Sequence, residues 1–241
     1  MRAKTPARRG AKAAGGRHIA LFGGTFDPVH SGHVAVARAA ERRFHLDCVY
    51  FIPSRRPPHK PASELCAFEH RFAMVALACS AYPRFVPSLA EANMNGASPH
   101  VFYSIDTVRR FRQEFNGPGD RIYFIMGADS FLDLHAWKDY GELLQLCHFV
   151  VANRPGFRIG ALREVIPPAL LAPTDAKTAR DSRVIQLRDT AVYLLETVAS
   201  SVSATDVRKR IEHGRPVRGL VPPRVEEYIT KQALYRRMLY T

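Results

Sequence analysis

The side chains best placed for chemistry are His30 and His33, which lie in a glycine-rich run over residues 23–33. Apolar residues 19–22 precede this run and helix-forming residues 34–43 follow it, an order that predicts a strand, a glycine turn and the first turn of a helix. A spacing of three places both imidazoles on one side of that helical turn. Because free backbone N–H groups and the positive end of the helix dipole point at the same spot, the pattern predicts a site for a phosphate group that gains charge during a reaction.

A tight turn flanked by surface histidines is the alternative interpretation of the same run. Three glycines, one proline and two histidines within eleven residues favour the phosphate site over a simple turn. The run is not a Walker A loop, because no Gly-Lys-Ser/Thr follows it, and it is not the Gly-x-Gly-x-x-Gly dinucleotide fingerprint.

Predicted strands and helices alternate along the rest of the chain. The strands are expected at residues 19–22, 48–52, 121–126, 148–152, 184–187 and 192–194. The helices are expected at residues 34–44, 68–81, 104–115 (with Ser104 as the cap), 205–212 and 223–236, with a shorter one ending at 143–146. This alternation predicts an α/β fold with a doubly wound, mostly parallel sheet, helices on both faces and a small C-terminal helical part. Ligands of such sheets bind beyond the carboxyl ends of the strands, where the strand order reverses.

Composition limits the class of protein further. The chain has 241 residues, of which 46% are hydrophobic and 10% aromatic, enough for one large domain with a substantial core. We expect a cytoplasmic protein, because no apolar stretch approaches the roughly 20 residues of a membrane span and no apolar segment of a secretion signal follows the basic N-terminus. The four cysteines form no C-x-x-C pair, and no His, Cys and Asp cluster has the spacing of a fixed metal site.

Part of the net charge of +13 is local to the N-terminus. Residues 1–17 hold six basic side chains and no acid, which predicts a basic disordered tail ahead of one domain over residues 18–241. A basic surface attracts nucleic acid, anionic membranes or polyanionic small molecules. Because a site for phosphorylated substrates also needs positive potential, the charge alone does not distinguish these partners, and we interpret the tail as a solvated extension.

The run over residues 23–33 resembles the His-x-Gly-His signature of the nucleotidylyltransferase superfamily. Further segments narrow the resemblance, and they follow in order at residues 52–53, 57–60, 127–130, 154–156 and 203–208. Together they resemble bacterial nicotinate-nucleotide adenylyltransferases over about residues 18–241. The resemblance implies a Rossmann-like nucleotidylyltransferase fold and transfer of the adenylyl group of ATP to nicotinate mononucleotide, giving deamido-NAD and pyrophosphate in NAD biosynthesis.

The resemblance also assigns the ATP side of the site. His30 and His33 would contact the phosphates and stabilise the pentacoordinate transition state, with a role as a structural donor at the helix start as the alternative for His33. Arg208 would clamp the β- and γ-phosphates, although residues 203–208 alone also fit a helix cap followed by a surface arginine. The residues expected to bind ATP or its phosphates are Gly23, Gly24, Thr25, Phe26, Lys60, Gly127, Asp129, Ser203 and Thr205.

The nicotinate side rests on three further residues. By resemblance Trp137, the only tryptophan, stacks on the nicotinate ring, and a core position is its alternative. Tyr103 and Ser104 match the segment whose backbone N–H receives the nicotinate carboxylate, which would favour the acid over the amide because an amide NH₂ would clash with a donor. Many relatives have an aromatic residue after the tryptophan, whereas here Lys138 would bring a positive charge near the carboxylate. Arg154 either shapes a turn or approaches the adenine.

Mg²⁺ would arrive on ATP, held by phosphate oxygens and water. The expected partners are therefore ATP and nicotinate mononucleotide, without membrane or nucleic acid, and a homo-oligomer stays open. A competing hypothesis is another nucleotidyltransferase of the superfamily, such as a phosphopantetheine adenylyltransferase, although such enzymes lack the Pro-Pro-His-Lys loop of residues 57–60. Two hypotheses from different classes are a nucleic-acid-binding protein that uses the basic tail and an inactive nucleotide sensor, and the intact histidine pair argues against the sensor.

Overall fold

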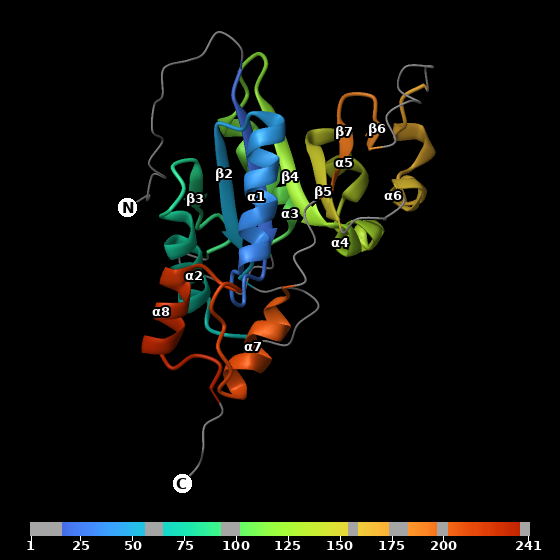
Figure 1. The fold of residues 1–241 in the computed structure, drawn as a ribbon. Coiled ribbons are helices and arrows are strands. Elements are labelled where there is room, and N and C mark those ends of the chain that lie inside the picture. Colours follow the sequence, from blue (N-terminus) through green and yellow to red (C-terminus); the bar gives the residue numbers. More distant parts are fainter. Residues whose placement is uncertain are drawn as a thin grey trace.

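A twisted seven-stranded sheet forms the centre of the computed structural model, which describes residues 16–55, 65–92, 102–153, 159–173, 183–196 and 202–236 (Figure 1). The strand order is β3-β2-β1-β4-β5-β7-β6, and all neighbours are parallel except β6 and β7. This architecture confirms the predicted doubly wound, mostly parallel sheet. The strands are β1 (His18–Gly24), β2 (Cys48–Pro53), β3 (Phe85–Pro87), β4 (Arg121–Gly127), β5 (His148–Asn153), β6 (Val184–Gln186) and β7 (Ala191–Glu196).

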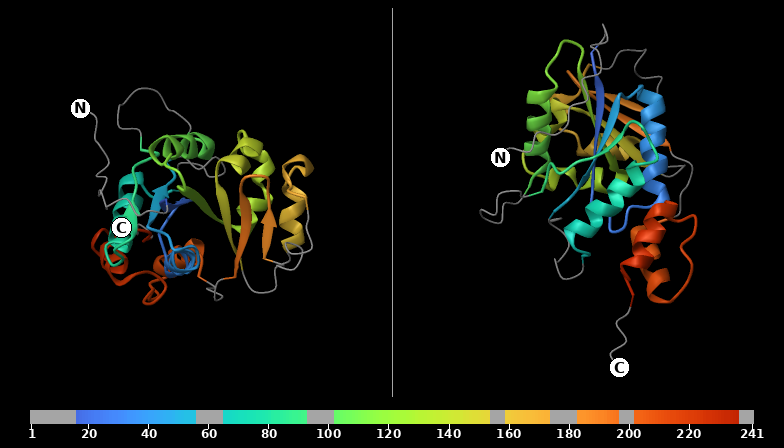
Figure 2. Two further views of the ribbon diagram at one scale, coloured as in Figure 1. Left: turned by 90° about the horizontal axis from the view of Figure 1, so that it is seen from above. Right: turned by 90° about the vertical axis from the view of Figure 1, so that its left-hand side faces the viewer.

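Helices cover both faces of the sheet (Figure 2). The described helices are α1 (Ser31–Phe44), α2 (Phe68–Cys79), α3 (Ser104–Glu114), α4 (Ala128–Leu132), α5 (Tyr140–Leu146), α6 (Ile159–Val165), α7 (Ala204–Glu212) and α8 (Pro223–Lys231), with 3₁₀ turns at Leu134–Ala136 and Pro168–Leu170. Helices α7 and α8 lie beyond the carboxyl ends of the strands, at the bottom of Figure 1, and form the predicted C-terminal helical part. No helix in the described ranges is long and apolar enough to cross a membrane.

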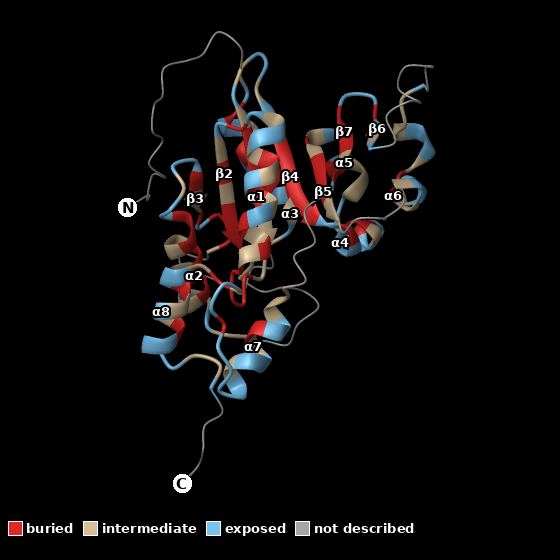
Figure 3. Ribbon diagram, in the orientation of Figure 1, coloured by how far each residue is buried: buried red, intermediate tan, exposed pale blue. Residues whose placement is uncertain are grey.

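Each central strand contributes alternate side chains to two separate cores. In β1, Leu21 packs into the core on the α3 side, while Ala20 packs into the core on the α1 side. In β4, Phe124 and Ile125 divide in the same way. Burial on both faces explains why these strands are continuous apolar runs in the sequence. Figure 3 shows β4 coloured as buried along most of its length. The two cores therefore hold the strands in place, and the candidate site lies at the carboxyl ends of these strands.

Several boundaries differ from the sequence prediction. Strand β3 and helices α4 and α6 were not expected, because segments of three, five and seven residues show too little periodicity to be recognised. Helix α8 ends at Lys231, so the predicted helix over residues 223–236 is too long. The N-cap of α3 is Tyr103 and not Ser104, which is the first helical residue.

Arg17 is part of the folded domain, although the sequence prediction placed it in the tail. Its backbone N–H donates to Oδ1 of Asp120 at 2.7 Å, and its guanidinium lies 4.4 Å from the centre of the Phe115 ring. Residues 1–15 lie outside the described part of the chain, so the basic tail stays a prediction.

Candidate active site

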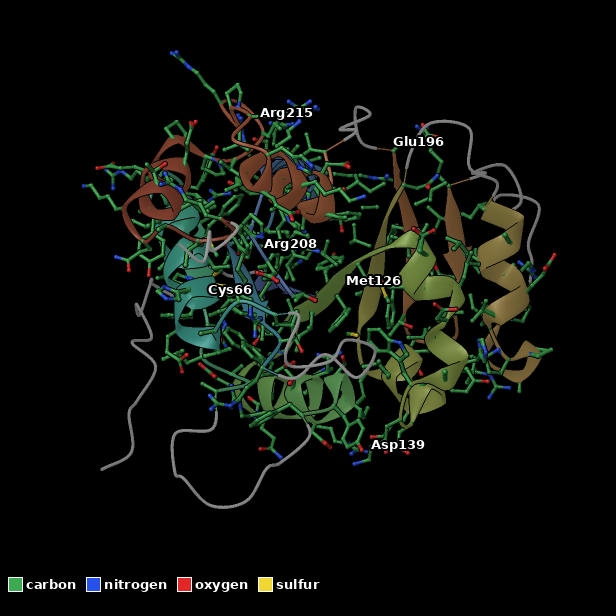
Figure 4. The ribbon with its side chains drawn as sticks, turned by 90° about the horizontal axis from the view of Figure 1, so that it is seen from below. Cys66, Met126, Asp139, Glu196, Arg208 and Arg215 are labelled. Atoms are coloured by element: carbon green, nitrogen blue, oxygen red, sulfur yellow. The ribbon has the colours of Figure 1, made fainter. Side chains whose placement is uncertain are left out.

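A cavity of about 820 Å³ opens at the carboxyl ends of β1, β2 and β4. The strand order changes direction here, because the chain runs outward from β1 to β3 and then crosses back to β4. Figure 4 looks onto this edge of the sheet, with Met126 of β4 and Arg208 of α7 near the centre and Arg215 at the margin. The cavity brings together most of the predicted site residues, namely Gly23, Gly24, Thr25, His30, His33, Tyr103, Ser104, Gly127, Asp129 and Trp137.

The two histidines form a stacked pair at the start of α1. Their ring centres are 3.6 Å apart, and the backbone N–H of His30, the N-cap residue, donates to Nδ1 of His33 at 3.1 Å. Because Nδ1 of His33 accepts this bond, its ring proton resides on Nε2, which is then a hydrogen-bond donor. His33 therefore has a structural role at the helix start, but as an acceptor and not as the donor that was predicted, and it also lines the cavity.

Burial keeps both imidazoles neutral. It lowers the pKa of His30 to about 4 and holds the pKa of His33 well below its usual value, with the nearby His30 lowering the latter further. Nδ1 of His30 is buried without a hydrogen-bond partner among the described residues. Both rings line the cavity, where the N–H of a neutral imidazole can donate a hydrogen bond to a phosphate oxygen.

The glycine turn after β1 is closely packed. A Cβ at Gly24 would lie 3.1 Å from the ring of Phe26, so a side chain at this position would push that ring. Phe26 is 2% exposed and packs edge-on against His33, with ring centres 5.0 Å apart. Its side chain therefore supports the histidine pair, and only its backbone N–H is left for the predicted phosphate contact.

Arg71 is a buried cation that sequence reasoning missed. The side chain is 1% exposed and donates to four backbone carbonyls: those of Thr25 (2.8 Å), Ser54 (2.7 Å), Arg55 (3.3 Å) and Cys66 (3.0 Å). It thereby ties the glycine turn to the segments on either side of residues 56–64. The only sequence signal is its place at helical spacing with apolar residues of α2, where a charge is unexpected.

Asp27 connects the turn to the C-terminal part. Its carboxylate accepts from the Tyr235 hydroxyl at 2.7 Å and from the Cys66 N–H at 3.4 Å, and its carbonyl accepts from Nη1 of Arg208 at 2.7 Å. The fold thus brings the second predicted motif to the first, three residues before His30. Neither Asp27 nor Tyr235 was predicted, because the partners are 208 residues apart in the chain.

The residues of the second motif do not reach the wall of the cavity. Ser203 caps α7 by accepting from the Asp206 N–H at 3.1 Å, and Thr205 accepts from Nη2 of Arg208 at 3.3 Å. The structure therefore shows Ser203 as the helix cap and Arg208 bonded to the turn, and their phosphate contacts stay predictions. Lys60 and Arg154 lie outside the described residues, so their roles also stay predictions.

The end of β4 forms an open part of the wall. Gly127 is the N-cap of α4, and a Cβ at this position would meet nothing within 4 Å, so packing within the protein does not require the glycine. Asp129 is exposed within α4 and lines the cavity. It is therefore not a helix cap. Both residues leave room for a ligand beside β4.

Aromatic groups form a further part of the cavity wall. Trp137 packs edge-on against Phe124, with ring centres 6.2 Å apart, and lines the cavity. Lys138 extends over the Tyr103 ring, with Nζ 4.5 Å from its centre, and lies 3.5 Å from a carboxylate oxygen of Asp106. Trp137 is thus partly core and partly cavity wall, and Lys138 places a cation beside it.

No group of three or more His, Cys, Asp or Glu side chains converges on a metal position within the described ranges. Magnesium bound to ATP needs no such group, because phosphate oxygens and water supply most of its ligands.

Known proteins resemble the chain over nearly all of its length. The cytidylyltransferase-like family matches residues 21–210. The probable nicotinate-nucleotide adenylyltransferase of Moorella thermoacetica is 39% identical over 221 residues, covering 92% of this chain and 93% of that protein. The corresponding protein of Geobacter metallireducens is 40% identical over 215 residues, covering 89% of this chain and 96% of that protein.

A solved structure has the same fold. The nicotinic acid mononucleotide adenylyltransferase of Plasmodium falciparum, complexed with NaAD, superimposes with a TM-score of 0.67 at 17% identity, covering 91% of this chain and 97% of that one. The chain belongs to the cytidylyltransferase-like family and, within it, to the nicotinate-nucleotide adenylyltransferases of NAD biosynthesis.

Proposed function

We propose that the cavity binds MgATP and nicotinate mononucleotide together and joins them directly. A phosphate oxygen of nicotinate mononucleotide forms a bond to the α-phosphorus of ATP, while the bond from that phosphorus to the bridging oxygen breaks and pyrophosphate leaves. No covalent enzyme intermediate is needed. The observation that carries this proposal is the neutral histidine pair that lines an open cavity beside the glycine turn.

The histidines act as hydrogen-bond donors to developing charge. In the free protein both imidazoles are neutral, because burial lowers their pKa values. Phosphate oxygens that approach the pair favour its protonated form, which shifts these pKa values upward when ATP binds. The Nε2–H of His33 then faces an oxygen whose negative charge grows in the transition state, so the hydrogen bond is strongest there.

The two sides of the cavity suit the two nucleotides. Gly127 and Asp129 line the open wall beside β4, where a flat base and a ribose fit. Trp137 offers an aromatic face to the cavity, and the neighbouring Lys138 lies over Tyr103 at the N-terminus of α3. The first backbone N–H groups of a helix have no partner within it, so Ser104 lies where a carboxylate is favoured. We assign adenosine to the first wall and nicotinate to the second.

The test is to identify the product and remove each histidine in turn. Purified protein with MgATP and nicotinate mononucleotide should yield deamido-NAD, measured by mass spectrometry. His30→Ala and His33→Ala should each lower kcat by about 10²–10³, the effect of losing one donor to developing charge. His213→Ala, an exposed histidine at the end of α7, is the matched control and should leave kcat unchanged. Near-normal turnover of either variant would remove that histidine from the site.

A further inference from the structure

A buried carboxyl group, that of Glu91, lies in the wall of the same cavity and has no role in the proposed transfer of the adenylyl group. Its side chain lines the cavity although the residue is only 8% exposed. The segment that carries it is fixed on both sides: the Ser88 N–H donates to the Phe51 carbonyl at 2.8 Å, and the Arg110 guanidinium donates to the Ala90 carbonyl at 3.2 Å. Glu91 is therefore held in place by the fold.

The immediate surroundings of this carboxyl group are hydroxyls. The hydroxyls of Ser54, directly after β2, and Thr107, in the first turn of α3, lie near enough to favour its charged form, and both also line the cavity. Arg110 is the nearby cation among the described residues. Burial outweighs these favourable contacts and raises the pKa of Glu91 to about 7.

An acidic side chain in the wall of this cavity is unexpected, because both proposed substrates are anions. A carboxylate close to a phosphate is repelled, so Glu91 suits a part of the substrate that offers neutral donors. A nucleotide offers such donors in the two hydroxyls of its ribose, and an acidic side chain binds a ribose hydroxyl in dinucleotide-binding α/β folds. Glu91 thus matches a sugar better than a base or a phosphate.

The position of Glu91 selects which sugar it meets. Glu91 follows β3 and contacts Ser54 of the neighbouring segment after β2, whereas Asp129 follows β4 on the other side of β1. The cavity therefore has one acid on each side of the glycine turn. Two nucleotides bound on either side of that turn would each bring one ribose to the cavity wall. Glu91 lies on the same side as Ser104 and Thr107 of α3, where nicotinate is assigned.

Resting on the proposed function, we infer that Glu91 accepts a hydrogen bond from a ribose hydroxyl of nicotinate mononucleotide. It is thus a binding residue for the acceptor, as Asp129 is placed to be for ATP. The hydroxyls of Ser54 and Thr107 hold the carboxyl group toward the cavity in the free protein and orient it for the sugar.

The experiment pairs a protein variant with substrates that lack one hydroxyl. Wild-type and Glu91→Gln proteins are assayed with nicotinate mononucleotide and with its 2′-deoxy and 3′-deoxy analogues. For at least one analogue, the wild-type kcat/KM should fall by about tenfold or more, the usual effect of losing a hydrogen bond to a charged group. In Glu91→Gln that penalty should shrink to about twofold or less, while the penalty for 2′-deoxy-ATP stays as in wild type. Glu164→Gln, an exposed residue of α6, is the matched control.

Each result decides the inference. If Glu91→Gln loses the same fraction of kcat/KM with every acceptor, the residue has only a structural role and the inference is wrong. If wild-type protein accepts both deoxy analogues as well as the parent, the inference also fails, and this result does not depend on the variant folding. A wild-type protein that makes no deamido-NAD from nicotinate mononucleotide would instead refute the proposed function itself.

Discussion

Removing the guanidinium of Arg71 tests whether the buried hydrogen-bond network supports the site. Arg71→Met keeps the length of the side chain in α2 but leaves four carbonyls without their donor, those of Thr25, Ser54, Arg55 and Cys66. Hydrogen bonds to charged groups contribute about 1.5–3 kcal/mol each, and water replaces part of them where the cavity opens. We therefore expect the free energy of unfolding to fall by about 4 kcal/mol, within the range for breaking a buried charged network.

For a domain of this size the expected loss corresponds to a melting temperature lower by about 8–16 °C, measured by calorimetry or circular dichroism at neutral pH. Arg71→Lys should lie between wild type and Arg71→Met, because an ammonium group can satisfy some but not all of the four acceptors. Arg42→Met, an exposed arginine of α1, is the matched control and should change the melting temperature by less than about 2 °C.

The folded Arg71→Lys enzyme should also turn over more slowly at 20 °C, since two of the carbonyls belong to residues that line the cavity, Thr25 and Ser54. The reasoning is refuted if Arg71→Met melts within about 2 °C of wild type. It is also refuted if Arg71→Lys melts no higher than Arg71→Met.

Four further predictions concern His30, Glu91 and the two residues of the nicotinate wall, Trp137 and Lys138. Burial lowers the pKa of His30 to about 4, so between pH 6.5 and 4 the unfolded chain binds this proton and the folded protein does not. The free energy of unfolding therefore falls as the pH drops through this range. His30→Asn should reduce this pH dependence by about 1.4 kcal/mol per pH unit, measured by urea unfolding. The pKa of Glu91 is raised to about 7, so between pH 4.5 and 7 the folded protein binds this proton and the unfolded chain does not, and Glu91 stabilises the fold as the pH drops. Glu91→Gln should therefore make the free energy of unfolding fall more steeply toward acid pH. An unchanged pH dependence would contradict the burial of Glu91. Trp137→Ala should raise the KM for nicotinate mononucleotide by about 5- to 100-fold through lost stacking, with the KM for ATP as the control that stays constant. Lys138→Ala should raise the same KM by about two- to fivefold at low salt and less at high salt, and a salt-independent effect would exclude a role for its charge.

The parts of the fold and site that could be predicted are those that depend on neighbouring residues in the sequence. The strand, turn and helix around His30 and His33 follow from consecutive residues, and the parallel sheet follows from the alternation of apolar runs with helical periods. The carboxyl-end rule for such sheets then places Gly127, Asp129 and the glycine turn in one cavity.

The parts that could not be predicted depend on contacts between distant segments. Tyr235 and Arg208 meet Asp27 across 208 and 181 residues, and no spacing within the sequence indicates these pairs. In the sequence Arg71 follows Glu69 at the start of a mostly apolar helix, and Glu91 is an ordinary acid in a loop. Only the fold places carbonyls around Arg71 and hydroxyls near Glu91. The contact between Arg208 and the turn belongs to the same class, and the phosphate clamp that the resemblance assigns to Arg208 stays a prediction.

The most direct test of the central claim is pyrophosphate release by the purified protein with MgATP, run in parallel with nicotinate mononucleotide and nicotinamide mononucleotide. The proposed site predicts rapid release with the acid and little with the amide, because the N-terminal turn of α3 near Ser104 and the cation of Lys138 both favour a carboxylate. Equal release with both acceptors would contradict this assignment of the nicotinate wall. No release with either acceptor, from folded protein that still binds ATP, would contradict the proposed reaction as a whole.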